Sequence, residues 1–584
     1  MGKLIKLFKY LKAKDWAFFA FSLVFMCAQV ALDLQIPDYM SGITRILESG
    51  GGVSEVWGTG GKMLLCAFGS LAASAVVCFF ASRIAADFSL RVRKVMFDKV
   101  ESFGLEEINK FSASSLITRS TNDVTQVQMM LVMALQVVVK APLMAAWAIT
   151  KIAGKAWQWS LATAITVVII TALLVVAIVV TFPRFKKVQW LQDALNRTAR
   201  ENLTGIRVVR AYNAEAYQES KFEKVNTELL DNSMFANRTM TMLSPFMSLA
   251  MNCLNMSIYW IGVVLINGAA VTARVDIFAD MIVFMSYAMQ VIASFIMIVM
   301  VAIISPRAIE AARRISEVLA TDPSVKDGSV TDGAPGESGT VEFRGVSFTY
   351  PGGSGHALSD ISFKANKGET VAFIGSTGSG KTTLVDLIPR FYDATEGEVL
   401  VDGVNVKDYK LDALYKKIGF VSQKAVMFTG TVADNVAFGE NADDSRLREA
   451  LEISRSDEFI SELEDGENAH VARGGTNFSG GQKQRLSIAR ALCRDAEILI
   501  FDDTFSALDL KTDRALRDEL KEKTQGVTKL IVAQRIGTIM SADRIVVLDE
   551  GRVAGIGTHR ELLNSCEVYR QIALSQLSEK ELAI

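Results

Sequence analysis

The chain has 584 residues, half of them apolar and 22% charged, with a net charge of −2 at pH 7. This composition excludes a disordered chain, and the balance of charges gives no sign of a nucleic-acid-binding surface. Six cysteines without a Cys-x-x-Cys pair argue against a zinc site or a disulfide scaffold. No cleavage site follows the first apolar run, so we do not expect a secreted protein. The high apolar content argues against a plainly cytosolic one.

The first fifteen residues alternate five lysines with leucine and phenylalanine. This pattern is typical of an amphipathic helix that lies on an anionic membrane surface. We therefore predict an amphipathic elbow helix over residues 1–15.

Long uncharged runs follow, up to about residue 306. A helix needs roughly 20 apolar residues to cross about 30 Å of hydrocarbon. Six segments meet this requirement, and together they predict a six-helix membrane domain over residues 16–320, with spans at about 16–47, 61–83, 129–153, 156–182, 244–267 and 279–304.

The connections between these spans predict their orientation. Those after the second and fourth spans, about 83–128 and 184–238, are long and rich in Lys and Arg, whereas the others are short. Positive charge is retained on the cytoplasmic side, so both termini are expected in the cytoplasm. Helical periodicity in both long connections predicts intracellular helices with short breaks near Ser114–Asp123 and Ala211–Tyr217.

Residues 321–340 are rich in Gly, Ser, Asp and Pro, which predicts a linker. After it, β-branched strands alternate with helices, so residues 341–584 are expected to form a soluble α/β domain.

A phosphate-binding motif lies between a predicted strand and a helix in this domain. Its backbone N–H groups are expected to surround phosphates, its Lys to contact the β and γ oxygens, and its first Thr to ligate Mg²⁺. The motif consists of Gly375, Ser376, Thr377, Gly378, Ser379, Gly380, Lys381, Thr382 and Thr383. A second apolar strand ends in Asp502, which is aimed at the metal, and these features predict ATP and Mg²⁺ as ligands.

A third motif, Ser479, Gly480, Gly481 and Gln482, stands about 100 residues after the first. Together with Tyr350, Gln423, Asp509 and the membrane half, it resembles the ATP-binding cassette (ABC) transporters, specifically exporters with one six-helix membrane domain and one nucleotide-binding domain. The resemblance covers essentially the whole chain and implies an α-helical membrane domain fused to an α/β P-loop domain.

The resemblance also implies roles for these residues. Tyr350 would stack on adenine, Gln423 would contact Mg²⁺, and Ser479–Gln482 would contact the γ-phosphate of ATP held by a second subunit, with Asp509 at the dimer seam. The expected coupling residues in the two intracellular loops are Leu116, Arg119, Asp123, Ala211, Tyr212 and Glu215. Likeness to bacterial exporters implies a multi-pass protein of the bacterial cytoplasmic membrane, with amphipathic drugs, lipids or peptides as substrates.

Two residues depart from the family pattern in one reaction centre. Asp503 stands where the family usually has the catalytic Glu, and Gln534 stands where it usually has a His. Shortening the carboxylate by one methylene moves it by roughly 1.5 Å, and about 1 Å of misplacement costs on the order of 10²-fold. Gln534 hydrogen-bonds but cannot become an imidazolium. We therefore expect slow or absent hydrolysis at this chain's own site.

The intact signature motif serves the opposite site, which favours one half of a heterodimer whose partner supplies the Glu and the His. A homodimeric exporter and an ATP-regulated membrane sensor without transport are the alternatives.

In the membrane, polar groups predict a substrate path, because charge at mid-bilayer is costly and normally faces a cavity or a partner. The candidates are Asp33, Lys151, Asn252, Asn255, Tyr259, Tyr287, Gln290 and Ser294. As an alternative, the Lys151 side chain extends its charged end to the membrane surface. For the polar residues of the fifth and sixth spans, the alternative is hydrogen bonding between helices.

Overall fold

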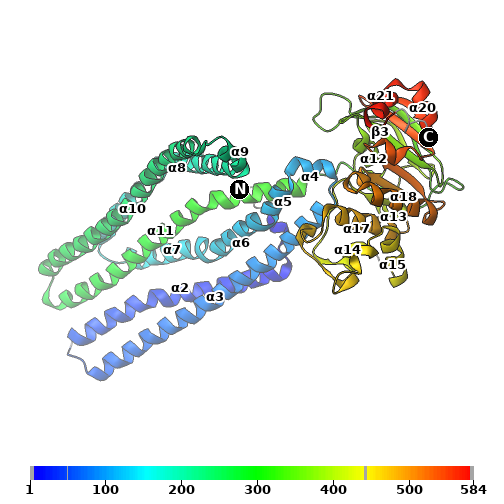
Figure 1. Ribbon diagram of the computed structural model, residues 1–584. Helices are drawn as coiled ribbons and strands as arrows, with labels where there is room; N and C mark the ends of the chain where they lie inside the picture. The colour runs from blue at the N-terminus through cyan, green and yellow to red at the C-terminus, as the bar shows by residue number, and fades with distance from the viewer. Residues whose placement is uncertain (1–5, 49, 440–442, 579–584) are drawn as a thin grey trace. The chain divides into compact units, whose positions relative to one another are not determined.

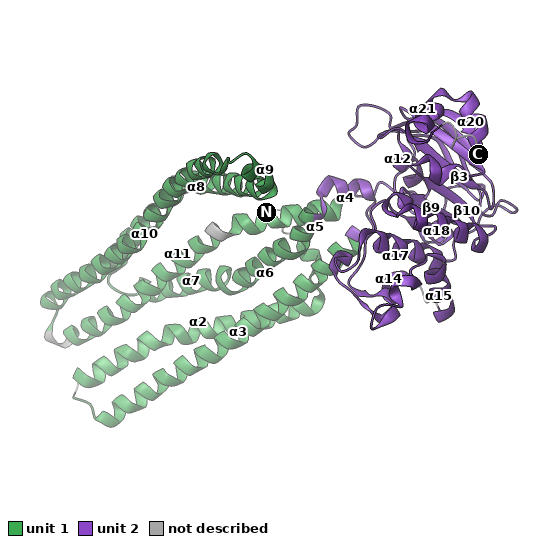
Figure 2. Ribbon diagram, in the orientation of Figure 1, with its two compact units in different colours: residues 1–99, 114–321 green, residues 100–113, 322–584 purple. Residues whose placement is uncertain are grey.

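The computed structural model describes residues 6–48, 50–439 and 443–578, apart from the side chains of residues 271–272 and 302–304. The chain forms two compact units (Figure 2). The first comprises Met1–Lys99 and Ser114–Thr321, and the second comprises Val100–Ala113 and Asp322–Ile584.

The first unit is helical (Figure 1). Within the described residues, 6 helices are long and apolar enough to cross a membrane, which confirms the predicted six-helix domain. They are α2 (Ala13–Glu48), α3 (Val53–Glu101), the segment α5 (Ala113–Thr118), η2 (Arg119–Asp123), α6 (Val124–Met133), η3 (Ala134–Val138) and α7 (Lys140–Ala153), then α8 (Trp157–Thr204), α10 (Glu215–Gly268) and α11 (Val271–Ala320).

The amino-terminal segment differs from the single helix predicted over residues 1–15. Residues 1–5 lie outside the described part, η1 covers Phe8–Tyr10, and α2 begins at Ala13. The carboxylate of Asp15 accepts a hydrogen bond from the Lys12 N–H (2.7 Å), which caps the start of α2 and separates it from η1. Arg91 of α3 pairs with the buried Asp15 (2.7 Å) and donates to the Tyr10 carbonyl (2.6 Å).

The first intracellular break is not where the sequence predicted it. The predicted segment Ser114–Asp123 is helical. The chain instead breaks on both sides of the short helix α4 (Leu105–Phe111), which belongs to the second unit, and Ser112 there has a φ of 63°. In the second loop, α9 (Ile206–Ala211) is followed by a turn at residues 212–214, inside the predicted break.

The second unit contains a six-stranded sheet with the order β12-β11-β3-β10-β9-β6. All neighbouring strands are parallel except the edge strand β12, which is antiparallel to β11. The strands are β3 (Thr370–Gly375), β6 (Ile418–Val421), β9 (Ile498–Asp502), β10 (Thr528–Val532), β11 (Arg544–Asp549) and β12 (Arg552–Gly557). This topology confirms the predicted α/β domain.

An antiparallel four-stranded sheet with the order β2-β1-β4-β5 and a two-stranded ribbon β7-β8 complete the strands. They are β1 (Val341–Phe348), β2 (Leu358–Ala365), β4 (Glu396–Val401), β5 (Val404–Asn405), β7 (Gly430–Thr431) and β8 (His470–Val471). The helices are α12 (Lys381–Asp386), α13 (Leu411–Lys417), α14 (Val432–Val436), α15 (Asp444–Ile453), α16 (Asp457–Ile460), η4 (Gly466–Asn468), η5 (Arg473–Gly475), α17 (Gly480–Cys493), η6 (Thr504–Ala507), α18 (Leu510–Lys523), α19 (Ile536–Ile539), α20 (His559–Ser565) and α21 (Glu567–Gln576).

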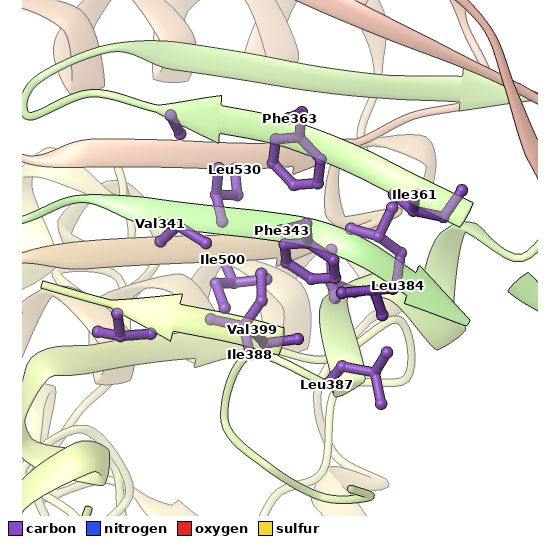
Figure 3. Packing of buried hydrophobic residues seen from close by; sticks show 14 of the residues in the cluster. Val341, Phe343, Ile361, Phe363, Leu384, Leu387, Ile388, Val399, Ile500 and Leu530 are labelled. Carbon is purple, nitrogen blue, oxygen red and sulfur yellow. The ribbon is translucent and has the colours of Figure 1, made fainter. Parts of the chain in front are cut away.

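One buried core of this unit combines residues of the two larger sheets (Figure 3). Phe343 and Phe363 stack with ring centroids 4.7 Å apart on neighbouring strands of the antiparallel sheet. They share one buried cluster with Leu384 of α12 and with Ile500 and Leu530 of the parallel sheet. The helix that follows the phosphate-binding motif is therefore fixed by the apolar core on which it packs.

Candidate functional site

Four separate segments of the sequence meet at one edge of the parallel sheet. The phosphate-binding motif follows β3, Gln423 follows β6, Asp502 and Asp503 follow at β9, and Gln534 follows β10. The carboxyl ends of parallel strands share one edge, where open α/β sheets bind their ligands. The topology thus brings these residues together, as the hydrogen bonds between them show.

The phosphate-binding loop has the backbone geometry of an anion cradle. Gly378 and Gly380 have φ angles of 85° and 94°, which side chains rarely adopt. A Cβ at Gly378 would meet no atom within 4 Å, whereas one at Gly380 would lie 2.6 Å from Leu358. Lys381 donates to the carbonyls of Gly375 and Ser376, both at 2.8 Å, and burial lowers its pKa. These residues fit a phosphate chain bound by the loop.

The next residues fit a magnesium ion. The hydroxyl of Thr382 donates to an oxygen of Asp502 at 3.0 Å, and burial raises the pKa of that carboxyl. The described residues hold no cluster of three His, Cys, Asp or Glu that could bind a metal alone. Two oxygen ligands suit Mg²⁺, which completes its octahedral shell with water and substrate phosphates.

Asp503 directly follows β9 at this edge. It is 7% exposed and has a left-handed φ of 46°. One of its oxygens, Oδ2, accepts hydrogen bonds from the side-chain amides of both Gln534 (2.7 Å) and Gln423 (3.2 Å). Half of the carboxylate is therefore already engaged by neutral donors.

Tyr350 lies beside the same loop. Its ring is partly exposed, and its hydroxyl is 2.8 Å from that of Thr383. Phe348 and Tyr392 contact the ring edge-on, with centroids 4.9 and 5.5 Å away. Stacking on adenine stays a prediction, for which the aromatic position is suitable.

The signature motif forms the amino terminus of the 14-residue helix α17. The Ser479 N–H donates to the Gln482 side chain (2.8 Å), and the Gln482 N–H donates to the Ser479 hydroxyl (3.3 Å), which makes a capping box. Ser479 and Gly480 are exposed, and a Cβ at Gly480 would meet no atom within 4 Å. A helix amino terminus of this kind accepts an anion from outside.

Asp509 caps α18 and is exposed. Its carboxylate accepts hydrogen bonds from the N–H groups of Lys511 (3.1 Å) and Thr512 (3.0 Å), which hold its pKa below the usual range. The predicted position at a dimer seam is not tested by one chain.

Sequence reasoning missed α4 as a helix that contacts the nucleotide domain. Asn109 donates to the Tyr392 hydroxyl (3.1 Å), and Glu107 accepts from the N–H groups of Ser324 (2.9 Å) and Gly104 (3.0 Å). A signal was present, because a Gly followed three residues later by Glu is a helix-start pattern.

The residues expected to couple the first loop contact other helices of the first unit, and their coupling role stays a prediction. Leu116 is buried, Arg119 pairs with Glu317 (3.1 Å), and Asp123 is fully buried against Arg314 (2.6 Å). In the second loop, all three predicted residues are exposed around the turn, and these are Ala211, Tyr212 and Glu215.

Most of the predicted substrate-path residues have partners inside the membrane unit. Asp33 bonds to Ser70 and lies 3.7 Å from Lys140, whereas Lys151 pairs with Asp38 (2.7 Å). Tyr287 is buried and donates to the Leu34 carbonyl and to Asp38, and the buried Ser294 donates to the Gln290 carbonyl. Asn252 and Tyr259 are exposed, and Asn255 is half-buried. The substrate path itself stays a prediction.

Comparison with known proteins identifies the family. Residues 6–303 match the ABC transporter transmembrane region, and residues 358–506 match the ABC transporter domain. The chain belongs to the ABC transporters. It combines both modules as a half-transporter of the exporter type, a multi-pass membrane protein whose family couples ATP hydrolysis to transport.

Related proteins match over most of their length. An uncharacterized ABC transporter ATP-binding protein of Mycobacterium tuberculosis (strain ATCC 25618 / H37Rv) is 37% identical, over 89% of this chain and 88% of that protein. One from Bacillus subtilis (strain 168) is 34% identical over 96% of both. An ATP-dependent lipid A-core flippase of Pseudomonas aeruginosa is 32% identical over 86% of this chain and 82% of that protein. A bacterial Atm1-family ABC exporter with ATP bound has the same fold, with a TM-score of 0.80 at 22% identity over 96% of this chain and 98% of that chain.

Proposed function

We propose that this chain is one half of a heterodimeric exporter and that its own ATP site hydrolyses slowly. The observation that carries the proposal is the arrangement at Asp503, a short carboxylate with one oxygen bonded to two glutamine amides. A catalytic base must reach the water that it activates, and neither amide can take up a proton. The pocket therefore combines phosphate-binding chemistry with a poor base.

ATP binding and ATP hydrolysis depend on different residues of this pocket. Lys381 and the loop amides hold phosphates, and Tyr350 offers a ring to the base. Thr382 and Asp502 would hold Mg²⁺, which supplies charge neutralisation at the phosphates when bound. None of these contacts depends on the length of Asp503. We therefore infer tight ATP binding with slow turnover.

The signature motif supports the second half of the proposal. Ser479 and Gly480 lie exposed at the start of α17 and are free to contact the γ-phosphate of ATP in a second chain. That second site needs a Glu and a His from a non-identical partner. Its turnover would reset the complex after each transport step.

The proposed cargo is an amphipathic small molecule, with lipids favoured among drugs, lipids and peptides. Relatives named lipid A-core flippases share 30–32% of residues over most of this chain. Reconstituted vesicles with fluorescent lipids, dyes and peptides would identify the class. ATP-dependent movement of none of them would contradict export.

The dimer proposal is tested by purifying the full chain alone in lipid nanodiscs. We expect little ATP hydrolysis and no stimulation by amphiphiles, followed by a large gain when a half-transporter with Glu and His at the two positions is added. A dimer of this chain alone with substrate-stimulated hydrolysis would instead establish a homodimeric exporter.

A further inference from the structure

The last described helix, α21, ends beside the segment that carries Gln534. The side-chain carbonyl of Gln576 accepts a hydrogen bond from the Ile536 N–H at 2.8 Å. Its side-chain amide donates to the Gln534 carbonyl, also at 2.8 Å. One side chain thus uses both of its polar atoms on the main chain of a three-residue segment.

The segment is also held by packing, since Ile536 is fully buried in an apolar cluster. Gln534 follows directly on Ala533 at the end of β10, is exposed, and precedes the 4-residue helix α19. Arg535 donates to the Ser506 carbonyl at 3.3 Å, which is a weaker contact than either bond from Gln576. Gln576 therefore supplies two hydrogen bonds, both at 2.8 Å, that hold the main chain of this turn from another helix.

The contacts continue to the reaction centre. The side chain of Gln534 donates to Oδ2 of Asp503 at 2.7 Å, and Gln423 donates to the same oxygen. Moving the main chain of Gln534 by an ångström would move its amide off the carboxylate, because the bond length tolerates only a few tenths.

We propose that Gln576 is a positioning residue for ATP hydrolysis: it holds the Gln534 main chain so that the Gln534 amide stays on Asp503. The carboxy-terminal helix thereby acts on the reaction centre through one polar side chain. This inference concerns how the site is held and is independent of whether its hydrolysis is slow.

The first test is hydrogen–deuterium exchange of the full chain with Gln576→Ala. Exchange of the segment 534–540 should rise on the order of tenfold, because the Ile536 N–H loses its acceptor. Gln576→Glu keeps an acceptor for the Ile536 N–H but has no donor for the Gln534 carbonyl. Its exchange rate should therefore lie between those of the unsubstituted chain and Gln576→Ala. Gln571→Ala is the matched control, since Gln571 is exposed on the same helix and its side-chain amide donates to Glu567 of that helix. Unchanged exchange in Gln576→Ala would overturn the proposal.

The second test is a double-mutant cycle on single-turnover ATP hydrolysis, followed for hours so that slow rates are measured. Gln576→Ala should lower the rate by about three- to tenfold while ATP affinity stays within about twofold, because Lys381 is untouched. In a Gln534→Ala background, Gln576→Ala should change the rate by less than about 1.5-fold. An equal loss in both backgrounds would show a merely structural role and refute the proposal.

The two proposals fail separately. Fast hydrolysis by the unsubstituted chain contradicts the slow site, yet the ratio between the four variants still measures the coupling of Gln576 to Gln534. If the chain alone does not hydrolyse ATP, hydrogen–deuterium exchange at the Ile536 N–H decides whether Gln576 holds this segment.

Discussion

The nucleotide domain contains two half-sites that differ in how they use their polar groups. At the sheet edge, Asp503 is buried and bonds to two amides of its own chain. At the start of α17, Ser479 and Gly480 are exposed, and Ser479 bonds to Gln482 in a capping box. The polar groups of the first half-site are therefore bonded within the chain, whereas those of the second are accessible to another molecule. We infer from this difference that separate residues serve ATP binding, ATP hydrolysis and the completion of a partner's site.

The largest expected effect comes from closing the exposed half-site. Gly480→Asp places a carboxylate where the γ-phosphate of the partner's ATP would lie, and the fold has room for its Cβ. Turnover of the assembled complex should fall by about 100-fold or more through charge repulsion. The matched variant Asp503→Asn should change it by less than about twofold. Steady-state phosphate release measures both, and equal losses would erase the difference between the half-sites.

Removing the charge of the phosphate-binding lysine should have the next largest effect. Lys381→Met should weaken ATP binding in this chain's pocket by roughly 10–100-fold, because charge-assisted hydrogen bonds contribute about 1.5–3 kcal/mol. Fluorescent-nucleotide titration of the purified chain measures it. Lys521→Met, on the exposed side of α18, serves as control. Unaltered affinity would mean that the loop does not hold the nucleotide.

Restoring the longer carboxylate should have a smaller effect. Asp503→Glu should raise single-turnover hydrolysis by less than about tenfold, because Gln534 still cannot take up a proton. Adding Gln534→His should raise it further. Asp518→Glu, an exposed change of the same kind, should do nothing. Full recovery by Asp503→Glu alone would show that carboxylate length was the single defect.

The smallest effect concerns pH. Burial, and then the charge of Asp502, raises the pKa of Asp386 from 3.8 to about 7. The folded state therefore binds more protons between these values, so the stability from this group is full below about pH 4 and is lost as pH rises through 7. Asp386→Asn should raise the unfolding temperature by roughly 2–4 °C at pH 8 and change it little at about pH 4. Scanning calorimetry of the full chain checks this, and equal shifts at both pH values would contradict it.

Several residues of the predicted nucleotide pocket lie close together in the structure because their sequence signals are local. Lys381 and Thr382 lie six and seven residues from the start of one motif, and Gln423, Asp503 and Gln534 each follow a strand of the same parallel sheet. The strand pattern therefore placed Asp502 beside the motif, whereas Asp503 and Gln534 were found through the family resemblance.

Contacts between distant elements could not be predicted in this way. No spacing links Gln576 to Gln534, because their contact depends on where α21 packs. The pairing of Asp33 with Lys140 likewise depends on the rotation of two helices. The break near Ser112 was misplaced because helical periodicity continues on both sides of it.

The most direct test is to trap the assembled complex during turnover and identify the nucleotide in each pocket. The account predicts ATP held by Lys381 and ADP in the opposite pocket, which Ser479 completes. ADP found equally often in both pockets would contradict it.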